Sequence, residues 1–171
     1  MARRNTNNMV KFGLAGFARI QIAENGRVMG DSGWVHNVIT DYGLDEGLAC
    51  VLAVQAESVR AAYAALGTGT APATNATALS GENAATAGRD ALSFGTGTSA
   101  TGAACTARFY GTFASAESRC TATLAIQNIG LYTGSATSGS NLLCGATYTV
   151  STLNTNQDVN YTYEWRFATT T

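Results

Sequence analysis

Charged side chains are scarce in this sequence. They make up 12% of its residues, about half the usual share, and the formal net charge is −1. Lysine occurs once, as Lys11, so arginine supplies almost all of the positive charge. A chain with this balance has no general attraction for nucleic acid. Its surface must consist largely of Thr, Ser, Asn, Gly and Ala, which suits burial against other subunits as well as a plain neutral exterior.

Histidine is nearly absent too. His36 is the only one, so a His-rich metal site is excluded and a catalytic triad would depend on a single imidazole. The sequence has no P-loop, no HExxH and no GxSxG motif, and its carboxylates are scattered without the alternation of a calcium loop. We therefore expect no enzyme activity, no cofactor, no metal and no small-molecule substrate.

Long apolar runs are also missing. No run approaches the roughly 20 residues that a membrane-spanning helix needs. Residues 1–8 are polar, and Gly13, Gly16 and Arg19 interrupt the segment that follows, so we predict no secretory signal. These features predict that the protein has no membrane partner and that it is made and assembled in a cytoplasm.

The cysteines show no metal or redox spacing. No CxxC pair occurs, and each cysteine stands among apolar or small residues, as buried thiols do. We expect reduced core thiols, with a disulfide as the alternative. The four are Cys50, Cys105, Cys120 and Cys144.

The strongest structural signal in the sequence is the alternation of apolar and polar residues, which is typical of β-strands. It is clearest near the end of the chain, where aromatic and apolar residues at 159–167 alternate with polar ones. Many short strands of this kind predict an all-β fold, an antiparallel β-sandwich or jelly roll with one short α-helix. The clearest strand segments cover residues 14–22, 105–113, 120–126, 142–150 and 159–167.

Turn residues predict how some strands connect. Asn25-Gly26 is suited to a type I′ hairpin, with residues 27–36 returning antiparallel to 14–22. A second hairpin is expected between residues 105–113 and 120–126. Near Asn128 the apolar positions change parity, which predicts a β-bulge or a strand end.

One segment has helical periodicity. Residues 41–53 follow Thr40, a suitable N-cap, and carry Leu44, Leu48, Val51 and Leu52 at the spacing of one buried face. Residues 67–90 are almost wholly small and polar and predict a long loop, for which we expect a role in contact. We thus divide the chain into a flexible arm, 1–11, and a single β-sandwich domain, 12–171.

Aromatic side chains offer a binding alternative. Trp165 lies on the apolar parity of its strand and is expected in the core, whereas Tyr110 lies on the polar parity and is expected at an exposed surface. Trp34 fits either environment. Exposed aromatic rings are typical of glycan-binding surfaces, so a receptor- or glycan-binding module stays open.

A series of short motifs lies along the chain and serves here as a set of landmarks. The landmarks are Gly30-Asp31-Ser32-Gly33-Trp34, Asn37-Val38-Ile39-Thr40, Gly43-Leu44, 65–72, 77–82, Arg89 and Asn128-Ile129-Gly130-Leu131-Tyr132. In this order they resemble small virion structural proteins of tailed bacteriophages, which are capsid decoration (cement) proteins or tail-fibre and collar components. The final aromatic strand fits the same pattern.

The resemblance implies a β-sandwich that self-associates, commonly as a trimer, without catalysis or cofactor. We expect a capsid decoration protein on the virion surface whose partners are the major capsid protein and copies of itself, and which binds no nucleic acid. A tail-fibre or collar subunit is the alternative. The residues expected at the partner interface are Arg3, Arg4, Gly67, Thr68, Gly69, Thr70, Pro72 and Tyr110.

Overall fold

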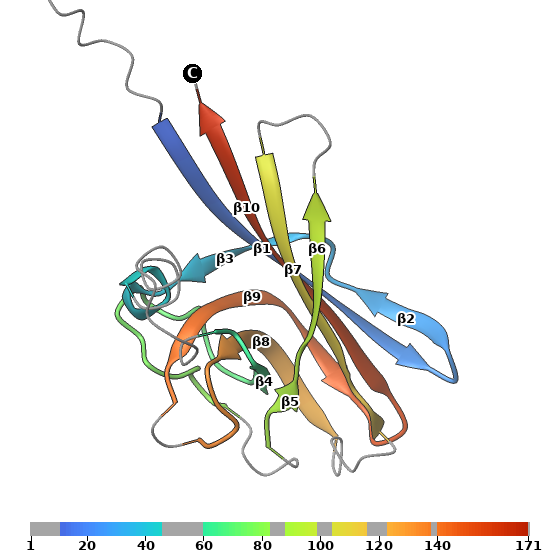
Figure 1. Cartoon of the computed structure of the whole chain (residues 1–171). Coiled ribbons are helices and arrows are strands. Elements are labelled where there is room, and N and C mark those ends of the chain that lie inside the picture. The colour runs from blue at the N-terminus through green and yellow to red at the C-terminus, as the bar shows by residue number, and fades with distance from the viewer. Residues whose placement is uncertain are drawn as a thin grey trace, which may run out of the picture.

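The structure is a computed structural model that describes residues 11–45, 60–82, 88–98, 104–115, 123–137 and 140–170. Strands account for most of these residues (Figure 1). In chain order they are β1 (Lys11–Glu24), β2 (Arg27–Asp31), β3 (Val35–Ile39), β4 (Tyr63–Gly67), β5 (Asp90–Ala91), β6 (Ser93–Thr98), β7 (Ala104–Phe113), β8 (Leu124–Tyr132), β9 (Leu142–Leu153) and β10 (Asp158–Thr170).

The strands form two antiparallel layers. Sheet A has the order β1-β10-β7-β6 with β2 on β1, and sheet B has the order β5-β4-β8-β9-β3. β3 joins the two layers, because it pairs with β1 through Val35 and His36 and with β9 through residues 37–39. At the opposite edge only Leu92 separates β5 of sheet B from β6 of sheet A. The result is a nearly closed antiparallel β-sandwich, which confirms the predicted fold class.

The core lies between the two sheets. In β10, Val159, Tyr161, Tyr163 and Trp165 are buried, as their alternation predicts. The Tyr163 hydroxyl donates a 2.6 Å hydrogen bond to the Ile129 carbonyl of β8, so it ties sheet A to sheet B. Burial of these aromatic rings supplies a large share of the apolar contact that holds the layers together.

The predicted turn at Asn25-Gly26 is confirmed. Both residues have positive φ, 50° and 77°, and Glu24 pairs with Arg27 across the turn. The returning strand is shorter than predicted, since β2 ends at Asp31 and Gly33 turns the chain at φ 64°. The predicted irregularity near Asn128 is also present, as a register shift between Ile126 and Asn128.

The predicted hairpin between residues 105–113 and 120–126 is wrong. β7 pairs with β6 and β10 in sheet A, whereas β8 pairs with β4 and β9 in sheet B. The chain crosses from one layer to the other between these two strands. Alternation marks each strand correctly but does not tell in which of two facing layers it lies.

The predicted helix begins where expected, but Leu44, the first residue of its predicted buried face, is exposed. Residues 41–45 are helical, and the Gly43 amide donates a 3.0 Å hydrogen bond to the hydroxyl of Thr40, the predicted N-cap. Leu44 is 41% exposed, while Tyr42 packs against the core. The cause is the docking of Thr40, whose hydroxyl donates to the Leu143 carbonyl of β9. Leu48, Val51 and Leu52 lie outside the described residues.

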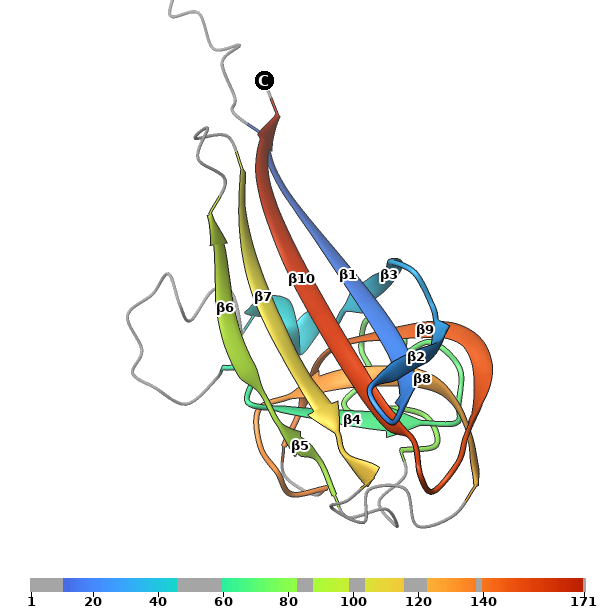
Figure 2. The ribbon, with the colours of Figure 1, turned by 90° about the vertical axis from the view of Figure 1, so that its right-hand side faces the viewer.

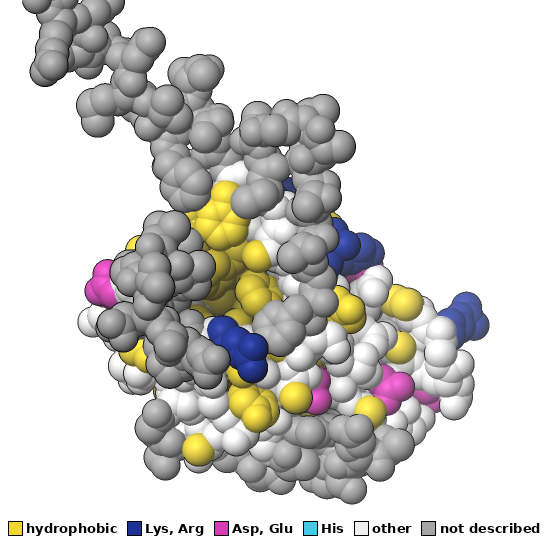
Figure 3. Space-filling view, viewed as in Figure 1, with side chains coloured by type: hydrophobic (Ala, Val, Ile, Leu, Met, Phe, Trp, Pro, Cys, Tyr) yellow, Lys and Arg dark blue, Asp and Glu magenta, His cyan; other side chains and the backbone are white. Residues whose placement is uncertain are grey.

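Sheet A is longer than sheet B. Figures 1 and 2 show β1, β10, β7 and β6 continuing past the strands of sheet B, which run across them. Over this part of sheet A, apolar side chains gather in a hollow (Figure 3). Leu14, Ala107 and Phe167 are only partly buried. The described residues thus leave part of the inner face of sheet A without a second layer.

Candidate functional site

The residues predicted to meet a partner do not form one surface. Arg3 and Arg4 lie outside the described residues, as do residues 1–10 of the predicted arm, whereas Lys11 begins β1. Tyr110 lies on β7 of sheet A, and residues 67–72 follow β4 of sheet B. The described candidates therefore fall at two separate places, and their role in partner contact stays a prediction.

Residues 67–72 differ in how much they offer a partner. Gly67 and Pro72 are buried within the chain, Thr68 and Thr70 are exposed, and Gly69 is intermediate. A molecule that approached this loop would meet the two threonine side chains first.

The loop that begins there is held on sheet B by side-chain amides. Asn128 is fully buried, and its Nδ2 donates hydrogen bonds of 3.1 and 2.9 Å to the carbonyls of Thr70 and Ser80. Gln127 Nε2 donates a 3.0 Å hydrogen bond to the Gly69 carbonyl. Two adjacent side chains of β8 thus fix both ends of residues 69–80, because they satisfy carbonyls that have no strand partner.

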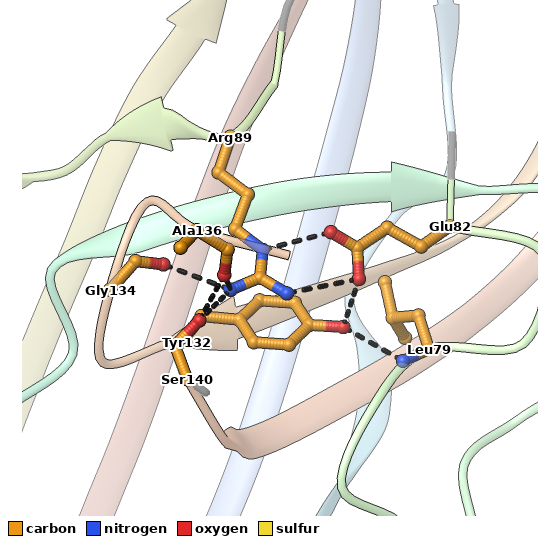
Figure 4. A network of polar contacts seen from close by, with 7 residues as sticks. All are labelled: Leu79, Glu82, Arg89, Tyr132, Gly134, Ala136 and Ser140. Atoms are coloured by element: carbon orange, nitrogen blue, oxygen red, sulfur yellow. Dashed lines mark hydrogen bonds and ion pairs between the residues drawn. The ribbon is translucent and has the colours of Figure 1, made fainter. Parts of the chain in front are cut away.

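A buried guanidinium holds the far end of the same loop (Figure 4). Arg89 Nε and Nη2 donate to the two carboxylate oxygens of Glu82 at 2.8 and 3.2 Å, and the guanidinium carbon lies 3.4 Å from the centre of the Tyr132 ring. The Tyr132 hydroxyl donates to Glu82 and accepts from the Leu79 amide, both at 2.7 Å. Arg89 Nη1 reaches the loop after β8, at the carbonyls of Gly134 and Ala136 and the hydroxyl of Ser140. This network joins two loops and has a structural role.

A groove lies on the outer face of sheet A and is here named the outer groove. Its volume is about 740 Å³. Two aromatic side chains on it, Trp34 and Tyr110, are 43% and 44% exposed, although large aromatic residues usually have most of their surface buried. The lining residues are Arg19, Gln21, Trp34, Arg108, Tyr110, Gly111, Thr112, Asn160, Tyr161 and Thr162.

Strand register assembles this groove. Arg19 of β1 pairs with Thr162 of β10, and Thr162 pairs with Tyr110 of β7. A second row lies two residues away on each of the same strands. In it, Gln21 of β1 pairs with Asn160 of β10, and Asn160 pairs with Thr112 of β7. Because these positions alternate with buried ones, both rows point to the outer face. The sequence predicts that Tyr110 is exposed, but it does not predict which other residues line the groove with it. The residues of the two rows share only one sequence feature: each lies at an outward-facing position of its own strand, and the strands are far apart in the chain.

Ion pairs order the charged side chains of this face. The Arg19 guanidinium binds Asp31 through Nε and Nη2, and it holds the pKa of the Asp31 carboxyl well below its usual range. Arg108 and Arg166 bind opposite oxygens of Glu164. Burial alone raises the pKa of Glu164, but the two guanidiniums outweigh it and lower that pKa below its usual value. Both carboxylates are therefore ionised at neutral pH.

The described side chains include no cluster of three or more His, Cys, Asp or Glu residues that could hold a metal ion. His36 is exposed on β3 and packs its ring on Phe17, with the ring centres 4.6 Å apart. Cys144 is a free thiol in the core, and burial raises its pKa to about 12. It is therefore protonated and unreactive at neutral pH. Cys50 and Cys120, and the side chain of Cys105, lie outside the described part of the chain.

No helix in the described part of the chain has the length and apolar character needed to cross a membrane. Comparison of the chain with protein-family models, with curated proteins and with solved structures gives no match. A function for this chain can therefore be argued only from its own residues and their geometry.

Proposed function

We propose that this protein is a non-enzymatic structural subunit of a tailed-bacteriophage particle. In this proposal it is a capsid decoration protein that self-associates, binds the major capsid protein on the outside of the head and stabilises the shell. The landmarks from Gly30 to Tyr132 support the phage assignment by resemblance. The part of sheet A that no described residue covers supports a role in subunit contact.

The inner face of sheet A carries this proposal. Leu14 of β1 and Phe167 of β10 pair with each other across the two strands and are only partly buried against the core. Apolar surface that stays in contact with water costs free energy, which association with another subunit would recover. Only 12% of the residues are charged, and this scarcity also favours association with another subunit, because few ionic groups need to be desolvated.

The loop after β4 offers a second contact surface. Thr68 and Thr70 are exposed on a loop that Asn128 holds in place. Small side chains lose little conformational entropy when a partner covers them, and a loop that is already ordered loses little more.

Copy number on purified particles tests the proposal. Quantitative gel densitometry against the major shell protein should find many copies per particle for a decoration protein. A few copies per particle would favour the alternative, a tail-fibre or collar subunit. Absence from the particle would overturn both.

A matched pair of variants tests the loop. Thr70→Arg introduces a long charged side chain on the exposed loop and should lower occupancy on particles while the free energy of unfolding stays the same. Thr149→Arg, at an exposed position of β9, is the control and should leave occupancy unchanged. Equal occupancy of both variants would remove the loop from the contact surface.

A further inference from the structure

We propose that the outer groove of sheet A binds an oligosaccharide. This site goes beyond the structural role proposed above, since it lies on the opposite face of sheet A from the apolar surface that no described residue covers. Carbohydrate is the ligand class that best fits the combination of flat rings, amides, hydroxyls and oriented guanidiniums in one open groove.

The aromatic rings supply the first element of recognition. Trp34 and Tyr110 both line the groove and both expose more than two fifths of their surface. A sugar ring presents a flat face of C–H groups that packs on an aromatic ring, while its hydroxyls stay free at the rim. The Arg166 guanidinium lies 4.3 Å from the centre of the Phe17 ring and 5.7 Å from that of Trp34, so cation–π contacts help to orient the indole.

The groove floor supplies hydrogen-bonding groups that match hydroxyls. Gln21, Asn160 and Thr162 line the groove with amide and hydroxyl groups. The Thr112 hydroxyl donates a 2.7 Å hydrogen bond to Asn160 Oδ1, which orients the amide so that its Nδ2 is a donor. Sugar hydroxyls both donate and accept, so they pair with mixed groups of this kind.

Two arginines add oriented donors. Arg19 binds Asp31, and Arg108 binds Glu164, in each case through Nε and Nη2. This arrangement leaves Nη1 of both guanidiniums available for a ligand, because no hydrogen bond of Nη1 occurs in either pair. A guanidinium whose other edge is fixed donates in a defined plane and loses little entropy on binding.

The turn that carries Trp34 is fixed before any ligand arrives. The Ser32 amide donates to the Ile20 carbonyl and the Ile20 amide donates to the Ser32 hydroxyl, both at 2.9 Å. The Gly33 amide donates to Asp31 Oδ1 at 2.9 Å. Tyr110 stands on β7, inside sheet A. A groove built on fixed elements avoids much of the ordering cost of binding.

Other ligand classes fit less well. Nucleic acid requires an excess of positive charge, but Asp31 and Glu164 compensate two of the three arginines on this face. A protein partner requires an apolar centre, whereas amides, hydroxyls and guanidiniums share this groove with the two exposed rings. The volume of about 740 Å³ lies within the range of roughly 300–1,000 Å³ typical of small-ligand sites.

The test uses the purified full-length protein on an array of neutral and acidic oligosaccharides. The best-bound oligosaccharide is then titrated into isotope-labelled protein, and its chemical-shift changes should fall on the outer groove. Trp34→Ala and Tyr110→Ala should each weaken binding about tenfold or more, while Tyr110→Phe should retain most of it. Val150→Ala is the control, because this residue of β9 is 55% exposed and does not line the groove.

Three results would overturn the proposal. They are no binding on the array at millimolar concentration, shift changes away from the groove, and equal affinity of wild type and Trp34→Ala. Occupancy of the same variants on particles separates this site from the structural role. If Trp34→Ala lowers occupancy and no oligosaccharide binds, the groove is a protein contact and the carbohydrate assignment is wrong.

Discussion

Arg89 is buried although it carries a charge, and all three of its guanidinium nitrogens donate hydrogen bonds. It belongs to a small set of side chains that replace missing strand pairing in the long loop before β5. Glu82, Asn128 and Tyr132 also belong to this set. These residues stand in the landmarks that resemble phage proteins. Their contacts show that these four positions are needed to hold the loops of this fold in place.

Removal of the Arg89 side chain should destabilise the protein severely. Arg89→Ala leaves the Glu82 carboxylate and two carbonyls without their donor, and we expect a loss of about 3–5 kcal/mol in the free energy of unfolding. Arg89→Lys should recover only part of it, since an ammonium cannot reach Glu82 and both carbonyls in the same geometry. Urea denaturation monitored by tryptophan fluorescence measures the effect.

Arg27→Ala is the matched control for this measurement. Arg27 is exposed on β2, so its loss should change stability by less than about 0.5 kcal/mol. Similar midpoints for Arg89→Ala and Arg27→Ala would contradict the structural role of the network.

At the scale of elements, local signals predicted local structure. The hairpin at Asn25-Gly26 depends on the positive φ of two adjacent residues, and the core-facing residues of β10 depend on alternation within one strand. Both features are contained in a short stretch of sequence. The arrangement of β7 and β8 is not, because two consecutive strands with the same alternation can pair with each other or lie in facing sheets.

The outer groove illustrates the same limit. Arg19, Thr162 and Tyr110 become neighbours only through the register of β1, β10 and β7. Single-strand parity predicts that each side chain faces outward. It does not predict which outward residues meet, so Tyr110 was identified alone and the arginines beside it were missed.

The docking of residues 40–45 on β9 can be tested by alanine substitutions at two glycines, Gly43 and Gly30. A Cβ added at Gly43 would collide with the backbone carbonyl of Leu143, whereas a Cβ added at Gly30 would meet nothing within 4 Å. Helix propensity alone would make Gly43→Ala stabilising by about 1 kcal/mol. We expect the collision to dominate and Gly43→Ala to lower the free energy of unfolding by about 1–3 kcal/mol.

Gly30→Ala is the control and should be neutral or slightly stabilising, because Gly30 does not have a positive φ. Denaturant midpoints of the two variants and the wild type decide the sign. A gain in stability for Gly43→Ala would mean that the helical turn can move away from β9.

At the scale of the whole molecule, the two ends of the described chain lie side by side. β1 and β10 pair along their full length, from Lys11 with Thr170 to Ala23 with Asp158 (Figure 2). β10 lies between β1 and β7, in the middle of sheet A. The sheet therefore depends on contacts between residues that are far apart in sequence, a topology that folds slowly.

This adjacency predicts that a circular permutant will fold. A short Gly/Ser linker joins residue 170 to residue 11, and new ends are opened between Gly26 and Arg27 in the exposed turn. We expect the melting temperature to change by only a few degrees, because every long strand pairing is retained. A permutant opened between Ile129 and Gly130, both buried in β8, is the control and should not fold. Loss of structure in the first permutant would contradict the pairing of β1 with β10.

The central position of β10 also bears on synthesis. The ribosome makes β10 after every other strand of the sandwich. β1 and β7 are therefore synthesised before the strand that lies between them in the folded sheet. A chain that lacks β10 would keep two open strand edges in sheet A and would lose three buried aromatic residues, Tyr161, Tyr163 and Trp165. We therefore expect proteases to degrade such a chain.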